Sequence, residues 1–259
     1  MTAAYGELVL VDAADPVVTV LTLNRPDKRN ALSIGLIDQL TTAIQRAGGE
    51  PGRRVLILRA NGPAFCAGLD LGEAADPASA GRSAEALAAL YLAICHSPLV
   101  TIAAAQGAAF GGGAGLLAAC DFVVAGEDLH IGFPEVRRGL VAALVTCLVR
   151  RQLGDRWARE LVLLGEPVPA GRALDLGLVN RVVPVTGLLT TARELAQECC
   201  KGAPGAIART KRLLDDLAPR PIEEELRRAL QYHLEARQSA ESAEGIAAFR
   251  EKREPRWGA

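Results

Sequence analysis

The stretch Ala108-Ala109-Phe110-Gly111-Gly112-Gly113-Ala114-Gly115 decides the fold. It follows an apolar run over residues 99–105, which predicts a buried strand, and it leads into an apolar segment over 116–120, which predicts a helix. Glycines at a strand-to-helix junction leave backbone N–H groups uncovered at the positive end of the helix. Such a junction can stabilise negative charge.

A second turn of small residues, Phe65-Cys66-Ala67-Gly68-Leu69-Asp70, follows an apolar strand expected over residues 55–59. Two junctions of this kind in one domain could each place one N–H group on the same oxygen atom. Cys66 could be a nucleophile in this turn. A small apolar filler is favoured, because no basic residue stands beside it.

Length and composition set wide limits on the protein. The 259 residues suffice for one large domain or two small ones, and the formal net charge of −1 gives no general attraction to nucleic acid or acidic membranes. The six cysteines form no CxxC pair, which indicates reduced thiols. The first ten residues lack the basic region of a secretory signal, and no apolar run approaches the roughly 20 residues of a membrane span. We therefore expect a cytoplasmic protein that does not enter membranes.

Strands and helices are expected to alternate in the first half of the chain, and helices to fill the second half, so the fold class is α/β. The expected strands cover 17–23, 55–59, 99–105, 122–125 and a short stretch within 177–184. Ser33 caps a first helix that ends at Gly48-Gly49, 61–81 is expected to be a loop, and 84–95 is expected to be helical. From about residue 145 the expected helices cover 145–153, 156–164, 171–176, 187–201, 204–217, 222–238 and 243–252. The helix over 222–238 is interpreted as a surface helix on the core, with a subunit contact as the alternative.

Several kinds of chemistry find little support. His96, His130 and His233 are each expected to be structural, and no pair of them has metal-ligand spacing, so no metal site is expected. Residues 113–118 match the dinucleotide pattern GxGxxA, and Glu135 lies twenty residues after Gly115. However, residues 106–110 separate the strand from the first glycine, and the following helix is short, so this interpretation is a poor second.

Glu135 is the more interesting carboxylate, because it lies in a turn over 131–136 with apolar flanks. A carboxyl group in apolar surroundings has a raised pKa and can transfer protons near neutral pH. The alternative is an N-cap or an ion pair with Arg137 or Arg138.

Several ordered motifs together resemble the enoyl-CoA hydratase/isomerase (crotonase) superfamily, and the resemblance extends from about Val17 to Trp257. The motifs are residues 25–32 (RPDKRNAL), 65–71 (FCAGLDL), 106–113 (QGAAFGGG) with 119–121 (ACD), 133–135 (FPE) with Gly139, and 173–183 (ALDLGLVNRVV). The resemblance implies a spiral of ββα units with a helical C-terminal region that trimerises, often as a dimer of trimers. We place the core with the active site in residues 1–200 and the oligomerisation region in 201–259.

The resemblance also implies an acyl-CoA thioester as substrate and no separate cofactor. The thioester oxygen would lie between the N–H groups of Ala67 and Gly112, where an enolate forms, and Glu135 would transfer protons. Residues expected to contact the CoA or acyl parts are Lys28, Arg29, Ala31, Ala67, Gly68, Leu69, Asp70, Leu71, Gly112, Gly115, Phe249 and Lys252.

Two departures from the family pattern leave the reaction open. Hydratases usually carry a first glutamate where this chain has Gly115, and a Pro-Gly-x-Gly-Gly run where it has residues 140–146. Similar departures occur in proteins resembling methylglutaconyl-CoA hydratases. The nucleophilic aspartate of the dehalogenase branch would fall at Ala143, which excludes that branch.

The leading hypothesis is hydration of a 2-enoyl-CoA with Glu135 as the acid and base. Isomerisation of a 3-enoyl-CoA to a 2-enoyl-CoA by Glu135 alone is the alternative. A non-catalytic acyl-CoA-binding scaffold is the alternative from another class.

Overall fold

A six-stranded sheet forms the centre of the molecule in the computed structural model, which describes residues 7–74, 77–218 and 220–255. The strand order is β1-β2-β3-β4-β6-β9; β1 is antiparallel to β2, and the other pairs are parallel. The strands are β1 (Val9–Asp12), β2 (Val18–Leu23), β3 (Val55–Ala60), β4 (Val100–Ala105), β6 (Phe122–Gly126) and β9 (Arg181–Val183).

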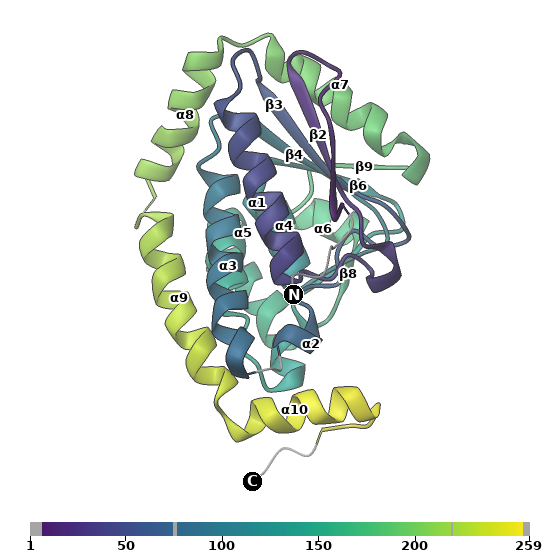
Figure 1. The fold of residues 1–259 in the computed structure, drawn as a ribbon, viewed down its shortest axis with the longest axis vertical. Helices are drawn as coiled ribbons and strands as arrows, with labels where there is room; N and C mark the ends of the chain where they lie inside the picture. Colours follow the sequence, from purple (N-terminus) through teal and green to yellow (C-terminus); the bar gives the residue numbers. More distant parts are fainter. Residues whose placement is uncertain (1–6, 75–76, 219, 256–259) are drawn as a thin grey trace.

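Helices cover both faces of this sheet (Figure 1). The helices α1 (Ile34–Gly49) and α3 (Pro77–Cys95) lie on one side, and α7 (Leu188–Cys200) packs on the other. Successive residues of a strand point to opposite faces, so Leu56 and Leu58 of β3 enter one core cluster while Val55 and Ile57 enter the other. This two-sided burial explains why the central strands read as continuous apolar runs.

A smaller sheet carries three strands that the sequence pattern missed, as it also missed β1 of the large sheet. Its order is β5-β7-β8, with β5 (Ala108–Phe110), β7 (His130–Gly132) and β8 (Val168–Pro169). Residues 106–110 were expected to be a plain connection, but β5 lies within them. Because β5 and β7 follow the large-sheet strands β4 and β6 along the chain, each pair leads into a helical segment, as a spiral of ββα units requires.

The buried α4 (Gly112–Ala119) follows β5 and packs against α5 (Ala143–Leu164). Two helices were expected in the region of α5, and Gly154, at φ 72° and ψ 174°, does interrupt the helical backbone there. The expected loop over 61–81 is partly helical, since it contains α2 (Leu71–Ala74) and the beginning of α3. Short 3₁₀ turns complete this half: η1 (Pro26–Lys28), η2 (Pro134–Arg138) and η3 (Val185–Gly187).

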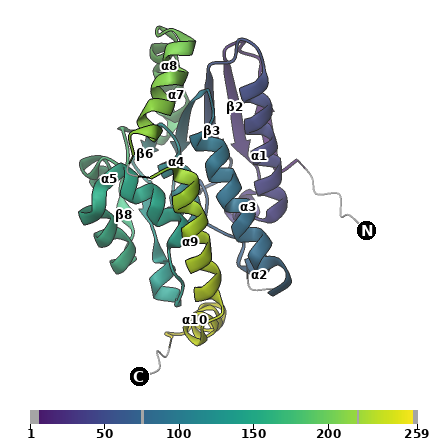
Figure 2. The ribbon, with the colours of Figure 1, turned by 90° about the vertical axis from the view of Figure 1, so that its left-hand side faces the viewer.

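The C-terminal helices run along the outside of the molecule and then turn across its end (Figure 2). After α6 (Ala170–Leu176) and α7 come α8 (Pro204–Asp216), α9 (Ile222–Arg237) and α10 (Ala240–Glu251). The helix α9 buries Ile222, Leu226 and Ala229 against α3 and α5, which confirms the surface helix on the core. Its use as a subunit contact, the trimer, and the division of the chain at residue 200 stay predictions, and Trp257 lies outside the described residues.

Candidate active site

A cavity of about 390 Å³ opens where the two small-residue turns meet η2, α9 and α10. Most of the residues expected to bind substrate line it: Lys28, Arg29, Ala31, Ala67, Gly68, Leu69, Asp70, Leu71, Gly112, Glu135 and Phe249. Gly115 and Lys252 are not among the residues that line it, so their contacts with substrate stay predictions. The cavity is therefore the candidate active site.

The first turn lies between two other chain segments. On one side, the Cys66 N–H donates to the Ala108 carbonyl at 3.0 Å; on the other, the Ala67 N–H donates to the Arg29 carbonyl at 3.0 Å. Ala67 was expected to donate to the substrate oxygen, but this bond already occupies its N–H group. The expected donor at Ala67 is therefore wrong, and the reason is the pairing of residues 67–70 with residues 29–32.

Leu69 provides the free donor of this turn instead. It forms a parallel bridge with Leu32. The Leu32 N–H donates to the Gly68 carbonyl at 2.8 Å, and the Leu32 carbonyl accepts from the Asp70 N–H at 3.0 Å. In such a bridge the N–H of the middle residue points away from the partner strand. Among the described residues the Leu69 N–H has no backbone acceptor, and Leu69 lines the cavity.

Gly112 begins α4 on the opposite side of this turn, and its N–H likewise has no acceptor within the described chain. The two turns touch: a Cβ added to Gly68, at φ +95°, would lie 2.8 Å from the Phe110 carbonyl oxygen and 3.6 Å from the Gly112 nitrogen. Glycine is therefore required at 68, both by the left-handed backbone and by this close approach. The expectation that two small-residue turns bring two N–H groups together is consistent with this geometry, with Leu69 in place of Ala67.

Gly115 is informative because a side chain has no room there. A Cβ at this position would lie 2.1 Å from the Tyr91 hydroxyl oxygen and 2.9 Å from Val145 Cγ1. Tyr91 is fully buried and its hydroxyl donates to the Gly112 carbonyl at 2.9 Å. The phenol of α3 thus fills the space beside Gly115 and holds the first residue of α4.

Glu135 faces the cavity from η2, directly after Pro134. Its Oε2 atom is buried without a hydrogen-bond partner among the described residues, and a Cβ on Gly111 would lie 3.0 Å from its Oε1. Burial raises the pKa of Glu135 to about 7, against smaller opposing effects from its own backbone N–H and from Arg138. An ion pair with Arg137 does not form, because Arg137 pairs with Glu166 at 2.8 Å. Glu135 can therefore both accept and donate a proton near neutral pH.

The remaining residues named from the sequence differ in how far they are exposed to solvent. Lys28 and Arg29 are exposed at the edge of the cavity. The Asp70 carboxylate forms an ion pair with Arg25 at 2.6 Å and accepts a hydrogen bond from the Gly72 N–H at 2.9 Å, so it is held in place. Cys66 is fully buried in the core, as an apolar filler would be, and this burial raises the pKa of its thiol to about 12.

Sequence reasoning missed several residues around the cavity. Arg138, His233 and Arg237 line it, and Tyr91 supports it. A signal for His233 existed, since it shares the apolar face of its helix with Leu226 and Leu230. The other histidines, His96 and His130, do not line the cavity.

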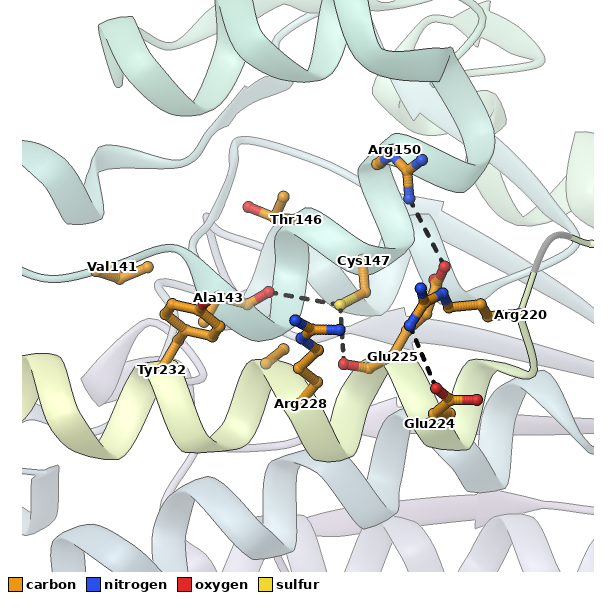
Figure 3. Close-up of a pocket in the computed structure, with 11 residues that line it drawn as sticks. Val141, Ala143, Thr146, Cys147, Arg150, Arg220, Glu224, Glu225, Arg228 and Tyr232 are labelled. Carbon is orange, nitrogen blue, oxygen red and sulfur yellow. Dashed lines mark hydrogen bonds and ion pairs between the residues drawn. The ribbon is translucent and has the colours of Figure 1, made fainter.

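A second hollow, of about 480 Å³, lies between α5 and α9 and shares Val141 and Ala143 with the first (Figure 3). Two of its three arginines lie close to its glutamates: Arg150 is 3.7 Å from Glu225, and Arg220 is 3.3 Å from Glu224. Burial raises the pKa of its Cys147 to about 11, so that thiol is protonated at neutral pH. Both glutamates that line this hollow in the described chain are near arginines, so neither is a free acid or base, and the smaller cavity remains the candidate site.

One cluster outside the cavity has metal-ligand chemistry. His96, Asp215 and Glu223 bring their ligand atoms within 4.8 Å of one another, although no spacing in the sequence indicated it. The cluster is internally bonded, because His96 Nε2 lies 3.2 Å from Glu223, and Arg151 pairs with Asp215. These contacts explain the cluster without an ion.

Two inward N–H donors and a buried carboxyl group, set in an α/β scaffold, are the parts of an acid–base enzyme acting on a carbonyl compound. A family model described as "Enoyl-CoA hydratase/isomerase" matches residues 14–259. The chain belongs to this family, is an acyl-CoA enzyme, and has the crotonase fold.

Named relatives span both activities of the family. The chain is 36% identical over 247 residues to the enoyl-CoA isomerase/hydratase fer4 of Mycosarcoma maydis, covering 91% of this chain and 90% of that protein. It is 34% identical over 241 residues to the 2,3-dehydroadipyl-CoA hydratase of Escherichia coli, covering 92% and 94%. A crystal structure of an enoyl-CoA hydratase/isomerase from Pseudoalteromonas atlantica superposes with a TM-score of 0.87 at 30% identity, covering 97% of this chain and 100% of that one.

The likeness to methylglutaconyl-CoA hydratases stays a prediction. In the described part of the chain, no helix combines the length and apolar character needed to cross a membrane.

Proposed function

We propose that this enzyme adds water to a 2-enoyl-CoA, with the Leu69 and Gly112 N–H groups binding the thioester oxygen and Glu135 transferring the proton. The observation that carries the proposal is one buried carboxyl group on a cavity that also exposes two unoccupied backbone donors.

The two N–H groups would stabilise the charge that develops during the reaction. When a nucleophile adds to C3 of a conjugated thioester, the electrons move onto the thioester oxygen and give an enolate. Fixed backbone donors stabilise that oxyanion without reorganising, and losing one donor typically costs on the order of 10²–10³ in rate. The dipole of α4 adds to the effect at Gly112.

A single carboxyl group can complete the hydration. Glu135 accepts a proton from water as the water oxygen bonds to C3, and the enolate forms. The protonated Glu135 then gives that proton to C2, and the thioester carbonyl re-forms. One water molecule is consumed, and the carboxylate returns to its starting state.

Isomerisation is the second candidate, and the absent side chain at Gly115 favours it. Moving a double bond from C3 to C2 requires one base that removes a proton from C2 and returns it to C4. Of the two carboxylates that line the cavity among the described residues, Asp70 is paired with Arg25, which leaves Glu135 for this work.

The test compares wild type with Glu135→Gln on 2-enoyl-CoA and 3-enoyl-CoA substrates, following the absorbance of the conjugated thioester. Hydration removes that absorbance and isomerisation creates it, so the two candidates give opposite signals. We expect the variant to lose roughly 10²–10⁴ in kcat, the usual contribution of a general acid–base group.

Glu127→Gln is the matched control, because Glu127 is exposed and does not line the cavity. It should behave as wild type. Equal rates for wild type and Glu135→Gln would overturn the role of Glu135. Tight acyl-CoA binding with no turnover of any enoyl-CoA would favour the non-catalytic scaffold instead.

A further inference from the structure

Three basic side chains gather on the C-terminal side of the cavity and have no part in the proposed proton transfer. Arg138 of η2 and His233 and Arg237 of α9 all line it and are half-buried. Lys28 and Arg29, in contrast, are exposed. The basic side chains of the cavity therefore form two sets that differ in their access to water.

Arg138 lies close to the reacting position. Residues i and i+3 of a 3₁₀ turn lie on the same face, so Arg138 projects beside Glu135, about 6 Å further along the axis of η2. Its guanidinium lies over the Phe249 ring, 4.5 Å from the centroid. In the chain as described, no carboxylate comes within ion-pair distance of Arg138. A half-buried guanidinium facing a cavity is thus left to bind a ligand.

Glu135 does not fill this role. Burial dominates the pKa of Glu135, and the attraction of Arg138 is the smallest of its causes. At neutral pH that carboxyl group is charged for part of the time, as its proton-transfer role requires, so the charge of Arg138 is incompletely balanced.

The helix α9 adds two further polar side chains, His233 and Arg237, to the end of the cavity where Arg138 lies. His233 and Arg237 are four residues apart and therefore lie on one face of the helix. The His233 Nε2 atom is buried without a hydrogen-bond partner among the residues described. Burial and then the charge of Arg237 lower the pKa of His233 to about 4, so the neutral ring keeps one N–H to donate.

The position of α10 indicates that this end of the cavity is a built feature. A Cβ on Gly245 would lie 2.0 Å from the Arg138 carbonyl oxygen, and one on Gly139 would lie 2.2 Å from the Glu241 carbonyl oxygen. Two glycines therefore let α10 and η2 meet backbone to backbone, which brings Phe249 over Arg138.

We propose that Arg138, assisted by His233 and Arg237, binds a carboxylate at the far end of the acyl group, so that the preferred ligand is the CoA thioester of a short dicarboxylic acid. The planar guanidinium forms paired hydrogen bonds with a carboxylate, and its place just beyond Glu135 puts that carboxylate a few bonds past the reacting carbons. This inference rests on the proposed function in taking the ligand to be an acyl-CoA. The phosphates of CoA are the other anions that Arg138 could bind, and the experiment separates the two.

The test measures the affinity of saturated acyl-CoA pairs that have equal chain length and end in either a methyl group or a carboxylate. We expect wild type to bind the carboxylated ligand more tightly. Arg138→Gln should weaken that binding by roughly 10- to 100-fold, the effect of losing hydrogen bonds to a charged group, while the methyl-ended ligand changes by less than about 2-fold. Arg138→Lys should recover part of the loss.

Arg137→Gln is the matched control, since Arg137 is exposed, pairs with Glu166 at 2.8 Å, and does not line the cavity. It should leave both affinities unchanged. Equal weakening of both ligands by Arg138→Gln would assign Arg138 to the CoA phosphates and overturn the proposal, as would a wild type that does not prefer the carboxylate. Because binding is measured without turnover, a protein that prefers the carboxylated ligand but converts no enoyl-CoA would overturn the proposed function alone.

Discussion

Gly115→Ala tests whether Tyr91 fills the position where hydratases of this family carry a glutamate. A glycine within a helix is normally improved by alanine, which gains about 1 kcal/mol from helix propensity. Here the structure predicts the opposite sign, because the added methyl group would lie 2.1 Å from the Tyr91 hydroxyl oxygen and 2.6 Å from its Cζ atom.

The size of the effect follows from how far Tyr91 must move. Ordinary contacts begin at 3.4 Å, so a distance of 2.1 Å falls short by 1.3 Å. Tyr91 is fully buried and cannot turn into solvent. Overpacking in a core costs about 1–3 kcal/mol, and the 1.3 Å shortfall against a fully buried ring places this site in the upper part of that range, at about 2–3 kcal/mol. After the propensity gain of about 1 kcal/mol is subtracted, we expect a net loss of about 1–2 kcal/mol. At roughly 2–4 °C per kcal/mol, Tm should fall by about 2–8 °C.

Activity should fall as well, because the displaced hydroxyl loses its 2.9 Å bond to the Gly112 carbonyl and releases the residue whose N–H would bind the thioester oxygen. A misplacement of about 1 Å in a catalytic group can cost on the order of 10² in rate. The assay is therefore thermal unfolding together with enoyl-CoA turnover on the same preparations.

Gly171→Ala serves as the control, since Gly171 lies in α6 and an added Cβ there meets nothing within 4 Å. Its Tm should stay level or rise. The double variant Tyr91→Phe with Gly115→Ala should lose less than the sum of its parts, because the closest contact is absent. A rise in Tm for Gly115→Ala comparable with that of Gly171→Ala would refute the account of Tyr91.

Three further predictions concern the proton of Glu135 and the binding of the oxyanion. The pKa of Glu135, raised from 4.5 to about 7 by burial, predicts that kcat/KM rises with pH through about 7 as the carboxylate forms. The same shift predicts that a contribution to stability present below pH 4.5 is lost as pH rises through 7, and that Glu135→Gln removes this slope in pH-dependent unfolding. Gly68→Ala, at φ +95° and 2.8 Å from a carbonyl oxygen, should lower kcat/KM by roughly 10²-fold through donor misplacement; Gly52→Ala, at φ +85° in open space, should affect stability and leave the rate unchanged.

The inner strands of the large sheet were predictable because burial on both faces leaves a strong signal, whereas the edge strand β1, which is half exposed, was missed. The strands β2, β3 and β4 are continuous apolar runs, and each was placed within one residue of its observed start. The strands of the small sheet carry no such signal. β8 has two residues and includes Pro169, and β5 lies in the glycine-rich stretch, so neither reaches the length at which alternation can be recognised.

The donor turn was recognisable from its small residues, but its working N–H was not. Local sequence shows that Cys66, Ala67 and Gly68 are small, and it does not show which N–H group of the turn points into the cavity. That direction is set by pairing with residues 29–32, more than thirty positions earlier in the chain, which occupies Ala67 and leaves Leu69. Tyr91 was missed for the same reason, since its contact with Gly115 joins two helices that only the tertiary fold brings together.

Where the family pattern has a first glutamate, this chain has Gly115 with the Tyr91 phenol beside it, and this difference changes what sets the pKa of Glu135. Two carboxylates in one site raise each other's pKa, because both resist being charged together. With a buried phenol in that space, burial raises the pKa of Glu135, and its own backbone N–H and then Arg138 lower it. A ligand carboxylate bound to Arg138 would cancel the attraction that lowers the pKa and would favour the protonated form of Glu135. The proposed substrate would therefore stabilise the acid that delivers the proton to C2, which couples recognition of the acyl end to the second step of the hydration.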